Sequence, residues 1–269
     1  MKIKQIGLIA GNGNFPLLVA DAAKSSGIKV VAVAIKSAAD KKIESIADET
    51  VWVGLGQAKK LIEVFKLRNI EYAVMAGKVN KVTLIKESLR LDSEAKNIIK
   101  KLANKKDDTL LSAIADYLKE LGIELIDSTL FIRDMMPAKG VLTKRRPIKK
   151  ELEDVKFGFE IAKEMGSLDI GQSVIIKDKA VIAVEAIEGT DEAIKRAGTL
   201  AGKRTVVVKV SKPNQDMRFD VPVVGLNTIE SLKCAKSSVL AIEAKKVIVF
   251  QIHKVIKEAE KAGISIIAV

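Results

Sequence analysis

The sequence predicts an α/β protein of two domains, the first built on a parallel sheet and the second of mixed type. Short segments rich in Val and Ile alternate with helical patterns as far as residue 127. Residues 128–150 break this alternation with two prolines, a glycine and a basic cluster. After residue 150 a helical pattern is followed by a hairpin pattern, which indicates antiparallel as well as parallel pairing.

The first domain, residues 1–127, is predicted to be Rossmann-like. Strands are expected at 4–10, 29–36, 50–53, 71–76 and 123–127, because each segment is short, apolar and bounded by Gly or polar residues. Helical periods at 17–25, 57–68 and 110–121 lie between them. Alternation of this kind favours a parallel sheet with helices on both faces.

The second domain, residues 151–269, follows a linker at 128–150. Its expected helices and strands, in order, are a helix at 151–165, a hairpin of 172–177 and 180–186, a helix at 191–197, a strand at 205–211, a helix near 228–235, paired strands at 239–242 and 247–251, a helix to 262 and a strand at 264–269. A long polar loop ending at Pro222 follows the strand at 205–211. This order predicts a distinct mixed α/β domain.

Composition favours a cytoplasmic protein. No apolar run approaches the roughly twenty residues of a membrane span, and the start of the chain lacks the pattern of a secretory signal. The single cysteine, Cys234, excludes an internal disulfide and fits a reducing compartment. We therefore expect a cytoplasmic location.

The net charge of +12 indicates an anionic partner, such as nucleic acid, phosphorylated metabolites or anionic lipid. Aromatic residues make up only 4%, too few for the stacking platforms of single-strand binders. Most basic residues alternate with Glu on predicted helices, and Lys144-Arg145-Arg146 is the one compact basic cluster. Nucleic acid is therefore the least favoured partner.

The stretch GLIAGNGNFP, residues 7–16, places Gly11 and Gly13 between a strand and a helix, where backbone N–H groups can approach a phosphate. The dinucleotide fingerprint requires a third glycine where Pro16 stands, and an acidic residue at the end of the second strand, which ends in Lys36 and Ser37. This is therefore not a standard NAD site. A nucleotide site and a tight turn that needs glycine backbone angles are about equally supported.

The stretch AVEAIEGTDEAIKRAG, residues 183–198, carries acidic residues around a glycine turn. Thr190 is a natural N-cap, and helix stabilisation alone explains Asp191 in the first turn. Glu185 and Glu188 have no such explanation. A carboxylate at the end of an apolar strand lies where α/β proteins collect ligands.

The stretch KVSKPNQDMRFDVPVVG, residues 209–225, alternates cations and carboxylates between two apolar segments. Lys209, Lys212 and Arg218 are suited to phosphate oxygens, whereas Asp216 and Asp220 are suited to a divalent cation or to orienting water. The alternative is an ordinary charged surface loop.

Apolar neighbours make Asp220 the strongest acidic candidate. Phe219 and Val221 flank it and should draw its carboxylate toward the packed base of the loop, where it needs a cation or a metal. The single histidine, His253, stands at the start of a predicted helix, and no His or Cys spacing suggests zinc. Oxygen ligands favour magnesium, with manganese as an alternative.

Five stretches together resemble the LpxI family of UDP-2,3-diacylglucosamine pyrophosphatases. They cover residues 7–16, 75–81 (MAGKVNK), 105–114 (KKDDTLLSAI), 169–198 and 209–225, and they occur in the same order over essentially the whole chain. The last two are long and specific. Phe15 departs from the leucine usual in the family.

The resemblance implies an activity and a site. Members of the family have a Rossmann-like N-terminal domain and a C-terminal α/β domain, with the lipid substrate held between them. With magnesium, they hydrolyse UDP-2,3-diacylglucosamine to UMP and 2,3-diacylglucosamine 1-phosphate, an intermediate of lipid A synthesis. The catalytic aspartate of the family's Arg-x-Asp-x-Pro segment falls on Asp220.

The expected site residues follow from both lines of reasoning. They are, for catalysis, Asp220, Asp216, Lys209, Lys212 and Arg218; for substrate binding, Gly11, Asn12, Gly13, Gly77, Lys78, Gln172, Thr190 and Gln215; and for the metal, Asp220, Glu185, Glu188 and Asp191. Expected partners are a UDP-linked diacylated glucosamine lipid and the inner membrane surface, with a homodimer left open. The alternatives are a hydrolase of a soluble nucleotide sugar and a non-catalytic nucleotide-binding protein.

Overall fold

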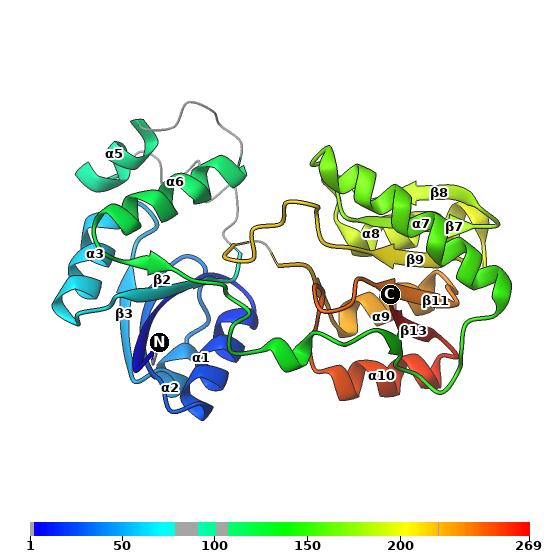
Figure 1. Ribbon diagram of the computed structural model, residues 1–269, viewed down its shortest axis with the longest axis horizontal. Helices are drawn as coiled ribbons and strands as arrows, with labels where there is room; N and C mark the ends of the chain where they lie inside the picture. The colour runs from blue at the N-terminus through cyan, green and yellow to red at the C-terminus, as the bar shows by residue number, and fades with distance from the viewer. Residues whose placement is uncertain (1–2, 79–90, 101–106, 220) are drawn as a thin grey trace. The chain divides into compact units, whose positions relative to one another are not determined.

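The computed structural model describes residues 3–78, 91–100, 107–219 and 221–269. These residues form two compact units (Figure 1). The first contains the chain up to Ile132 together with Met217–Phe219, and the second contains the remaining described residues. Each unit has its own sheet and its own hydrophobic core.

The first unit is built on a five-stranded parallel sheet of order β3-β2-β1-β4-β5. The strands are β1 (Gln5–Ala10), β2 (Lys29–Ile35), β3 (Glu49–Val53), β4 (Tyr72–Ala76) and β5 (Glu124–Leu125). Strands β1 and β2 are almost fully buried, as expected when helices cover both faces. The predicted strands are therefore confirmed, with ends shifted by at most two residues.

Helices cover this sheet on both faces. They are α1 (Phe15–Ser25), α2 (Ile43–Ile46), α3 (Ala58–Leu67), α5 (Ser93–Lys100) and α6 (Asp107–Glu120). Phe65 of α3 and Leu118 of α6 pack in one cluster with Val31 and Val33 of the sheet. Helices α1 and α2 pack together on the opposite face (Figure 1).

The second unit is built on a six-stranded mixed sheet of order β6-β13-β11-β9-β7-β8. Its strands are β6 (Gly140–Val141), β7 (Ser173–Lys177), β8 (Ala180–Val184), β9 (Val206–Lys209), β11 (Val239–Ile242) and β13 (Ser265–Ala268). Strands β9, β11 and β13 are parallel, whereas β6 pairs antiparallel with β13, β7 with β9 and β8 with β7. Strands β10 (Val223–Val224) and β12 (Ile248–Val249) form a separate parallel pair.

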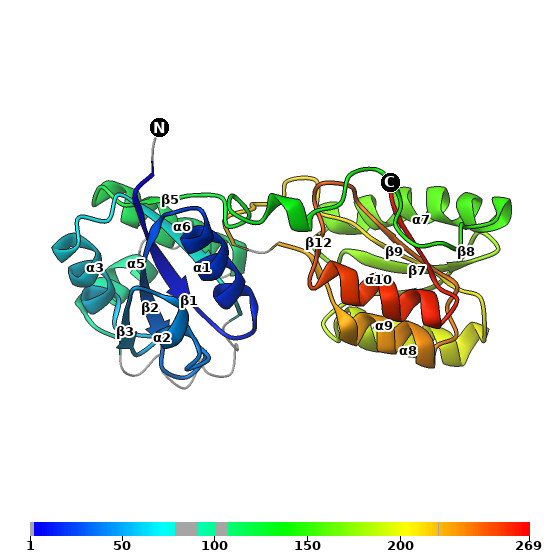
Figure 2. The same ribbon diagram turned by 90° about the horizontal axis from the view of Figure 1, so that it is seen from below.

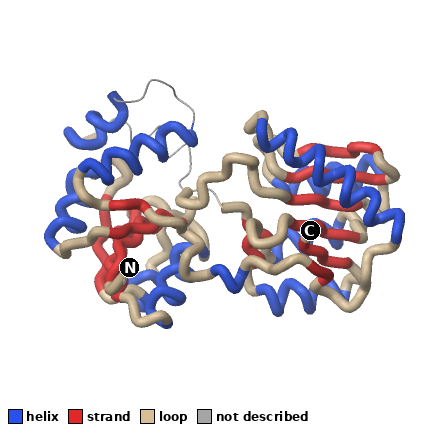
Figure 3. The backbone as a smooth tube through the Cα atoms, in the orientation of Figure 1, coloured by secondary structure: helices blue, strands red, loops and turns tan. Residues whose placement is uncertain are grey.

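Four helices sandwich this sheet. Helix α7 (Lys149–Ser167) packs on one face, and α8 (Thr190–Ala201), α9 (Leu226–Cys234) and α10 (Ile252–Lys261) pack on the other (Figure 2). Gly158 lets α7 approach closely, because a Cβ there would lie 2.8 Å from side-chain atoms of Ile176 and Val208. The tube view shows α7 lying across the near face of the strands (Figure 3).

One expected pairing is wrong. Segments 239–242 and 247–251 were predicted to pair with each other, but β11 lies between β9 and β13, and β12 pairs with β10. All four residues of β11 are buried. A continuous apolar run is typical of a central parallel strand covered on both faces, and the β11 sequence fits that pattern.

The boundary between the units falls inside the expected linker, between Ile132 and Arg133. The short 3₁₀ helix η2 (Arg133–Met135) begins the second unit. Strand β6 lies in the later part of the same segment and pairs with β13 through Val141 and Ile267. The part of the expected linker after Ile132 thus supplies an edge strand of the C-terminal sheet.

Candidate active site

The two longest charged blocks meet at one end of the strands of the second sheet, where β9 ends and α8 begins. Lys209, the last residue of β9, donates from Nζ to Thr190 Oγ1 over 2.7 Å. Thr190 Oγ1 in turn donates to Glu185 Oε1 over 2.8 Å. Lys209 is only 7% exposed, so its ammonium group requires polar partners such as this hydroxyl.

Further polar atoms surround this hydrogen-bond chain. Ser173 Oγ lies 3.3 Å from Thr190 Oγ1, and the Gln172 amide N–H donates to Glu185 Oε2 over 3.4 Å. Gln172 Oε1 and Asp191 Oδ1 are buried and make no hydrogen bond within the described part of the chain. Buried polar oxygens of this kind are suited to a ligand or an ion.

A second network holds the loop that follows β9. Glu243, directly after β11, accepts hydrogen bonds from Lys163 Nζ at 3.0 Å and from the Ser211 amide at 2.9 Å. Lys246 Nζ lies 3.0 Å from the same carboxylate. Burial opposes ionisation of Glu243, but these hydrogen bonds outweigh it and hold its pKa below the ordinary value.

The charged loop itself is pinned at Lys212. Its Nζ pairs with Asp169 at 2.6 Å, and its amide donates to Gln215 Oε1 over 3.2 Å. Gly166 of α7 packs against the Lys212 backbone, where a Cβ would lie 3.3 Å from the Lys212 Cα. The loop is therefore fixed to the end of α7.

The chain then returns to the first unit. Ser128 donates from its amide and its hydroxyl to Met217 O, over 3.1 and 2.7 Å. The Arg218 guanidinium lies 4.8 Å from the centre of the Phe219 ring, and Phe219 packs against the core of the first unit. Asp216 is half-buried. Asp220, the strongest candidate from the sequence, lies outside the described residues.

The expected metal ligands separate into two groups. Glu185 accepts the Thr190 hydroxyl and Asp191 follows Thr190 in α8, whereas Glu188 pairs with Arg196 at 2.7 Å. Hydrogen bonds from its own amide and from Arg196 lower the pKa of Glu188. Among residues 3–78, 91–100, 107–219 and 221–269, no three His, Cys, Asp or Glu side chains are grouped to hold a metal ion.

The glycine loop lies at the point in the first sheet where the strand order reverses, between β1 and β4. The amides of Gly11 and Asn12 donate to Ala76 O and Lys78 O, over 2.8 and 2.7 Å. These two N–H groups therefore already donate hydrogen bonds to the end of β4 and the loop that follows it. Gly13, with φ +97° and open space around it, has the conformation that favours glycine.

Sequence reasoning missed Glu243 and Lys163. Glu243 follows the apolar segment 239–242, which is the same signal that identified Glu185. Lys163 lies within a helix and resembles any surface lysine in sequence, so its contact with Glu243 depends on how α7 packs.

Two family models match almost the whole chain: the LpxI N-terminal domain over residues 5–135 and the LpxI C-terminal domain over residues 138–267. The chain belongs to the LpxI family. The two family models meet at residues 135–138, close to the boundary between the two units after Ile132. The α/β architecture of both units agrees with the fold that the sequence predicts.

Among curated proteins, this LpxI-family chain is similar to the UDP-2,3-diacylglucosamine pyrophosphatase LpxI of Caulobacter vibrioides, at 28% identity over 278 positions, covering 99% of this chain and 98% of that protein. It also resembles the bifunctional purine biosynthesis protein PurH of Thermoanaerobacter sp., at 27% identity over 65% of this chain and 33% of that protein.

Among solved structures, phosphoribosylglycinamide synthetase from Anaerococcus prevotii matches at 13% identity and a TM-score of 0.28, covering 77% of this chain and 45% of that one. A likeness at this level does not define a shared fold. Within the described residues, no helix is long and apolar enough to cross a membrane.

Proposed function

We propose that the protein hydrolyses the pyrophosphate bond of UDP-2,3-diacylglucosamine, giving UMP and 2,3-diacylglucosamine 1-phosphate for lipid A synthesis. The observation that carries the proposal is the similarity, over 99% of the chain, to a pyrophosphatase of that name. The contact between Lys209 and Thr190 adds support, because it brings the two longest charged blocks of the sequence together.

In this proposal Lys209 offsets the negative charge that develops on a phosphoryl oxygen. Thr190 holds the ammonium group in place, and Glu185 orients the Thr190 hydroxyl. Lys212 and Arg218 belong to the same loop and supply further positive charge. Asp220 organises the attacking water or the metal, as the family motif implies.

Magnesium assistance is part of the proposal, with manganese as an alternative. The donors around Thr190 are carboxylate, amide and hydroxyl oxygens, which suit a hard cation. Asp191 Oδ1 and Gln172 Oε1, buried without hydrogen bonds in the described part of the chain, are the open donors. Asp220, Glu185 and Asp191 would hold the ion, which would polarise a phosphoryl oxygen.

The proposed activity is tested by UMP release from UDP-2,3-diacylglucosamine with added Mg²⁺. We expect turnover of this substrate and none of UDP-N-acetylglucosamine, which lacks the acyl chains. Lys209→Met and Asp220→Ala should each lower the rate about a hundredfold, the typical cost of one lost electrostatic contact. Nucleotide binding without turnover would instead favour a sensor.

A matched pair of variants at Thr190 separates chemistry from packing. Thr190→Ser keeps the hydroxyl that bonds Lys209 and Glu185, whereas Thr190→Val keeps the shape and removes the hydroxyl. We expect Thr190→Ser to keep most of the activity and Thr190→Val to lose about tenfold or more. Equal activities of the two variants would remove Thr190 from the site.

Contact with the inner membrane surface is also proposed, because the acyl chains of the substrate begin in a bilayer and the chain carries a net charge of +12. Binding to anionic vesicles should weaken as salt is added. Vesicle binding that is insensitive to salt would contradict this part of the proposal.

A further inference from the structure

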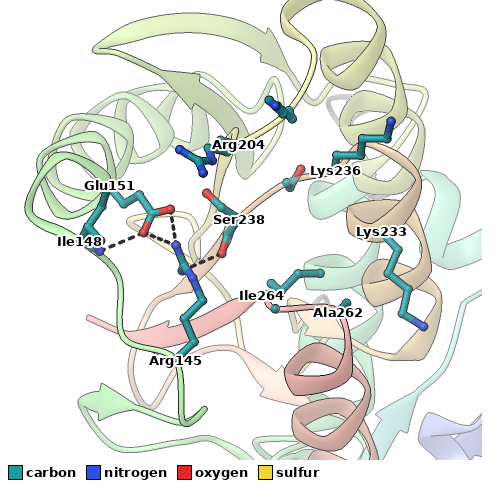
Figure 4. Close-up of a pocket in the computed structure, with 12 residues that line it drawn as sticks. Arg145, Ile148, Glu151, Arg204, Lys233, Lys236, Ser238, Ala262 and Ile264 are labelled. Carbon is teal, nitrogen blue, oxygen red and sulfur yellow. Dashed lines mark hydrogen bonds and ion pairs between the residues drawn. The ribbon is translucent and has the colours of Figure 1, made fainter.

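A basic pocket lies in the second unit at the end of the sheet where its parallel strands begin, and Lys209 lies at the other end of these strands. The pocket has a volume of about 550 Å³. Ser238 and Ile264, which directly precede β11 and β13, lie in it, so it opens at the start of the parallel strands (Figure 4). None of the residues assigned above to catalysis, substrate or metal lines it.

Five cationic residues and one acid line this pocket. They are Arg145, Lys203, Arg204, Lys233, Lys236 and Glu151, which gives a net charge of +4 (five minus one). Arg145 is fixed by Glu151 at 2.7 and 2.9 Å and by Ser265 Oγ at 2.8 Å. Burial opposes ionisation of Glu151, but the hydrogen bonds from Arg145 and the Ile148 amide, together with the positive charge of Arg145, outweigh it and lower the pKa of that carboxyl.

Three of the cations have no acidic partner within the described part of the chain. Lys233 pairs with Glu230 at 2.7 Å and with Glu258 at 3.4 Å. Lys203, Arg204 and Lys236 make no ion pair with described residues, and each is exposed at the rim of the pocket. Figure 4 shows Arg204 above Ser238 and Lys236 beside it on the α9 side.

Helix dipoles account for only part of this charge. Helices α8, α9 and α10 end at this pocket. Each helix C-terminus carries about half a negative charge, which gives roughly −1.5 charges in total. The N-terminus of α7, next to Ile148, adds about half a positive charge. The positive charge of the three unpaired cations therefore exceeds the net negative charge of the helix ends.

The backbone brings two of these cations together. Arg204 and Lys236 both have positive φ, at 67° and 52°, a conformation that usually favours Gly or Asn after a helix. The Arg204 amide donates to Lys236 O over 2.8 Å, so the two turns are tied to each other. Strained residues of this kind concentrate at functional sites.

We propose that this pocket binds a small solute that carries two or more phosphate groups. Its volume lies in the range of small-molecule sites, roughly 300–1,000 Å³, and is larger than a lone phosphate needs. The unpaired cations suit a polyvalent anion, while Ile148, Ala262 and Ile264 offer apolar contact to the rest of the solute. The proposal does not depend on the pyrophosphatase activity.

Backbone-amide NMR of the labelled full chain, titrated with inorganic pyrophosphate, tests this site. We expect saturable shifts at residues 203–205, 236–238 and 262–264. The double variant Arg204→Gln/Lys236→Gln should weaken binding at these amides at least about tenfold, because each exposed charge contact contributes roughly a factor of five. UMP release by this variant should equal that of the unmodified protein.

The matched control is Lys41→Gln/Lys42→Gln, which removes two exposed charges from the other unit. It should leave the pocket shifts unchanged. The proposal is overturned if pyrophosphate causes no saturable shift, if the pocket variant binds it equally well, or if sulfate binds as tightly. Sedimentation with phosphatidic acid vesicles that requires Lys236, without pyrophosphate binding, would make a lipid surface the partner and also overturn it.

Discussion

At the scale of single residues, Glu243 shows how a buried acid positions the proposed catalytic loop. Its carboxylate forms ion pairs with Lys163 and Lys246 and accepts a hydrogen bond from the Ser211 amide. The Glu243 amide donates to Lys209 O over 3.0 Å. The end of β9 and the start of the loop are thereby tied to β11. A buried ion pair contributes most visibly when one partner is removed, because the other charge is then left uncompensated.

Glu243→Gln tests this through the pH dependence of stability. The pKa of Glu243 is lowered in the folded state, so its contribution is complete above the ordinary value of 4.5 and is lost as the pH falls through the folded pKa. We expect Glu243→Gln to cost on the order of 3 kcal/mol at pH 7 and to flatten the acid side of the stability curve.

The measurement is urea unfolding followed by far-UV circular dichroism between pH 3 and 7. The control is Glu192→Gln, which breaks an exposed pair with Lys195 and should leave the free energy of unfolding nearly unchanged. An acid slope that is the same in Glu243→Gln and the unmodified chain would show that this carboxylate is not the titrating group.

At the scale of elements, the close approach of the loops after β1 and β4 explains why Gly11 and Gly77 are glycines. A Cβ on Gly77 would lie 2.7 Å from Asn12 O and 2.8 Å from Gly11 C, and a Cβ on Gly11 would lie 2.8 Å from Lys78 O. The two loops therefore pack backbone against backbone. Gly77 also has φ +88°, so two constraints act on it at once.

Gly77→Ala and Gly13→Ala separate these two constraints. Both positions have positive φ, but a Cβ on Gly13 meets nothing within 4 Å. We expect Gly13→Ala to cost about 1 kcal/mol through its backbone angle, and Gly77→Ala to cost about 3 kcal/mol or more because overlap is added. The fluorescence of Trp52, on β3 of the same unit, follows the urea transition. Equal costs would show that the loops can separate freely.

The β7–β8 hairpin shows a limit of sequence-based prediction at this scale. Its strands and its Asp178-Lys179 turn were predicted, and both turn residues have positive φ, as a two-residue hairpin requires. What holds them is Asp154 of α7, which accepts the amides of Asp178 and Lys179 over 2.9 and 2.7 Å. No local pattern connects residues 24 positions apart, so Asp154 could not be found.

At the scale of the whole molecule, periodicity and turn residues predicted both units, since short apolar segments bounded by Gly or polar residues are local signals. The pairing of β11 and β12 with other strands depends on distant segments and was missed. The site divides in the same way. Charged blocks after apolar strands identified Lys209 and Glu185, whereas the contact of Lys163 with Glu243 depends on tertiary packing.

The return of Met217–Phe219 to the first unit is the clearest non-local feature. Phe219 is half-buried against the first unit's core, although it comes from the second half of the chain. The one Trp and both Tyr residues, Trp52, Tyr72 and Tyr117, also lie in the first unit. Fluorescence therefore reports the unfolding of that unit alone, and far-UV circular dichroism reports both.

Phe219→Ala should lower the free energy of unfolding seen by fluorescence by about 2 kcal/mol, because a half-buried aromatic ring loses its contacts. The matched control is Phe159→Ala, which removes a partly buried ring from the core of the second unit. It should shift the circular dichroism transition and leave the fluorescence transition in place. If Phe219→Ala leaves the fluorescence transition unmoved, the residues next to Asp220 are not anchored by the first unit, and the position of the loop must be set by Lys212 and Glu243 alone.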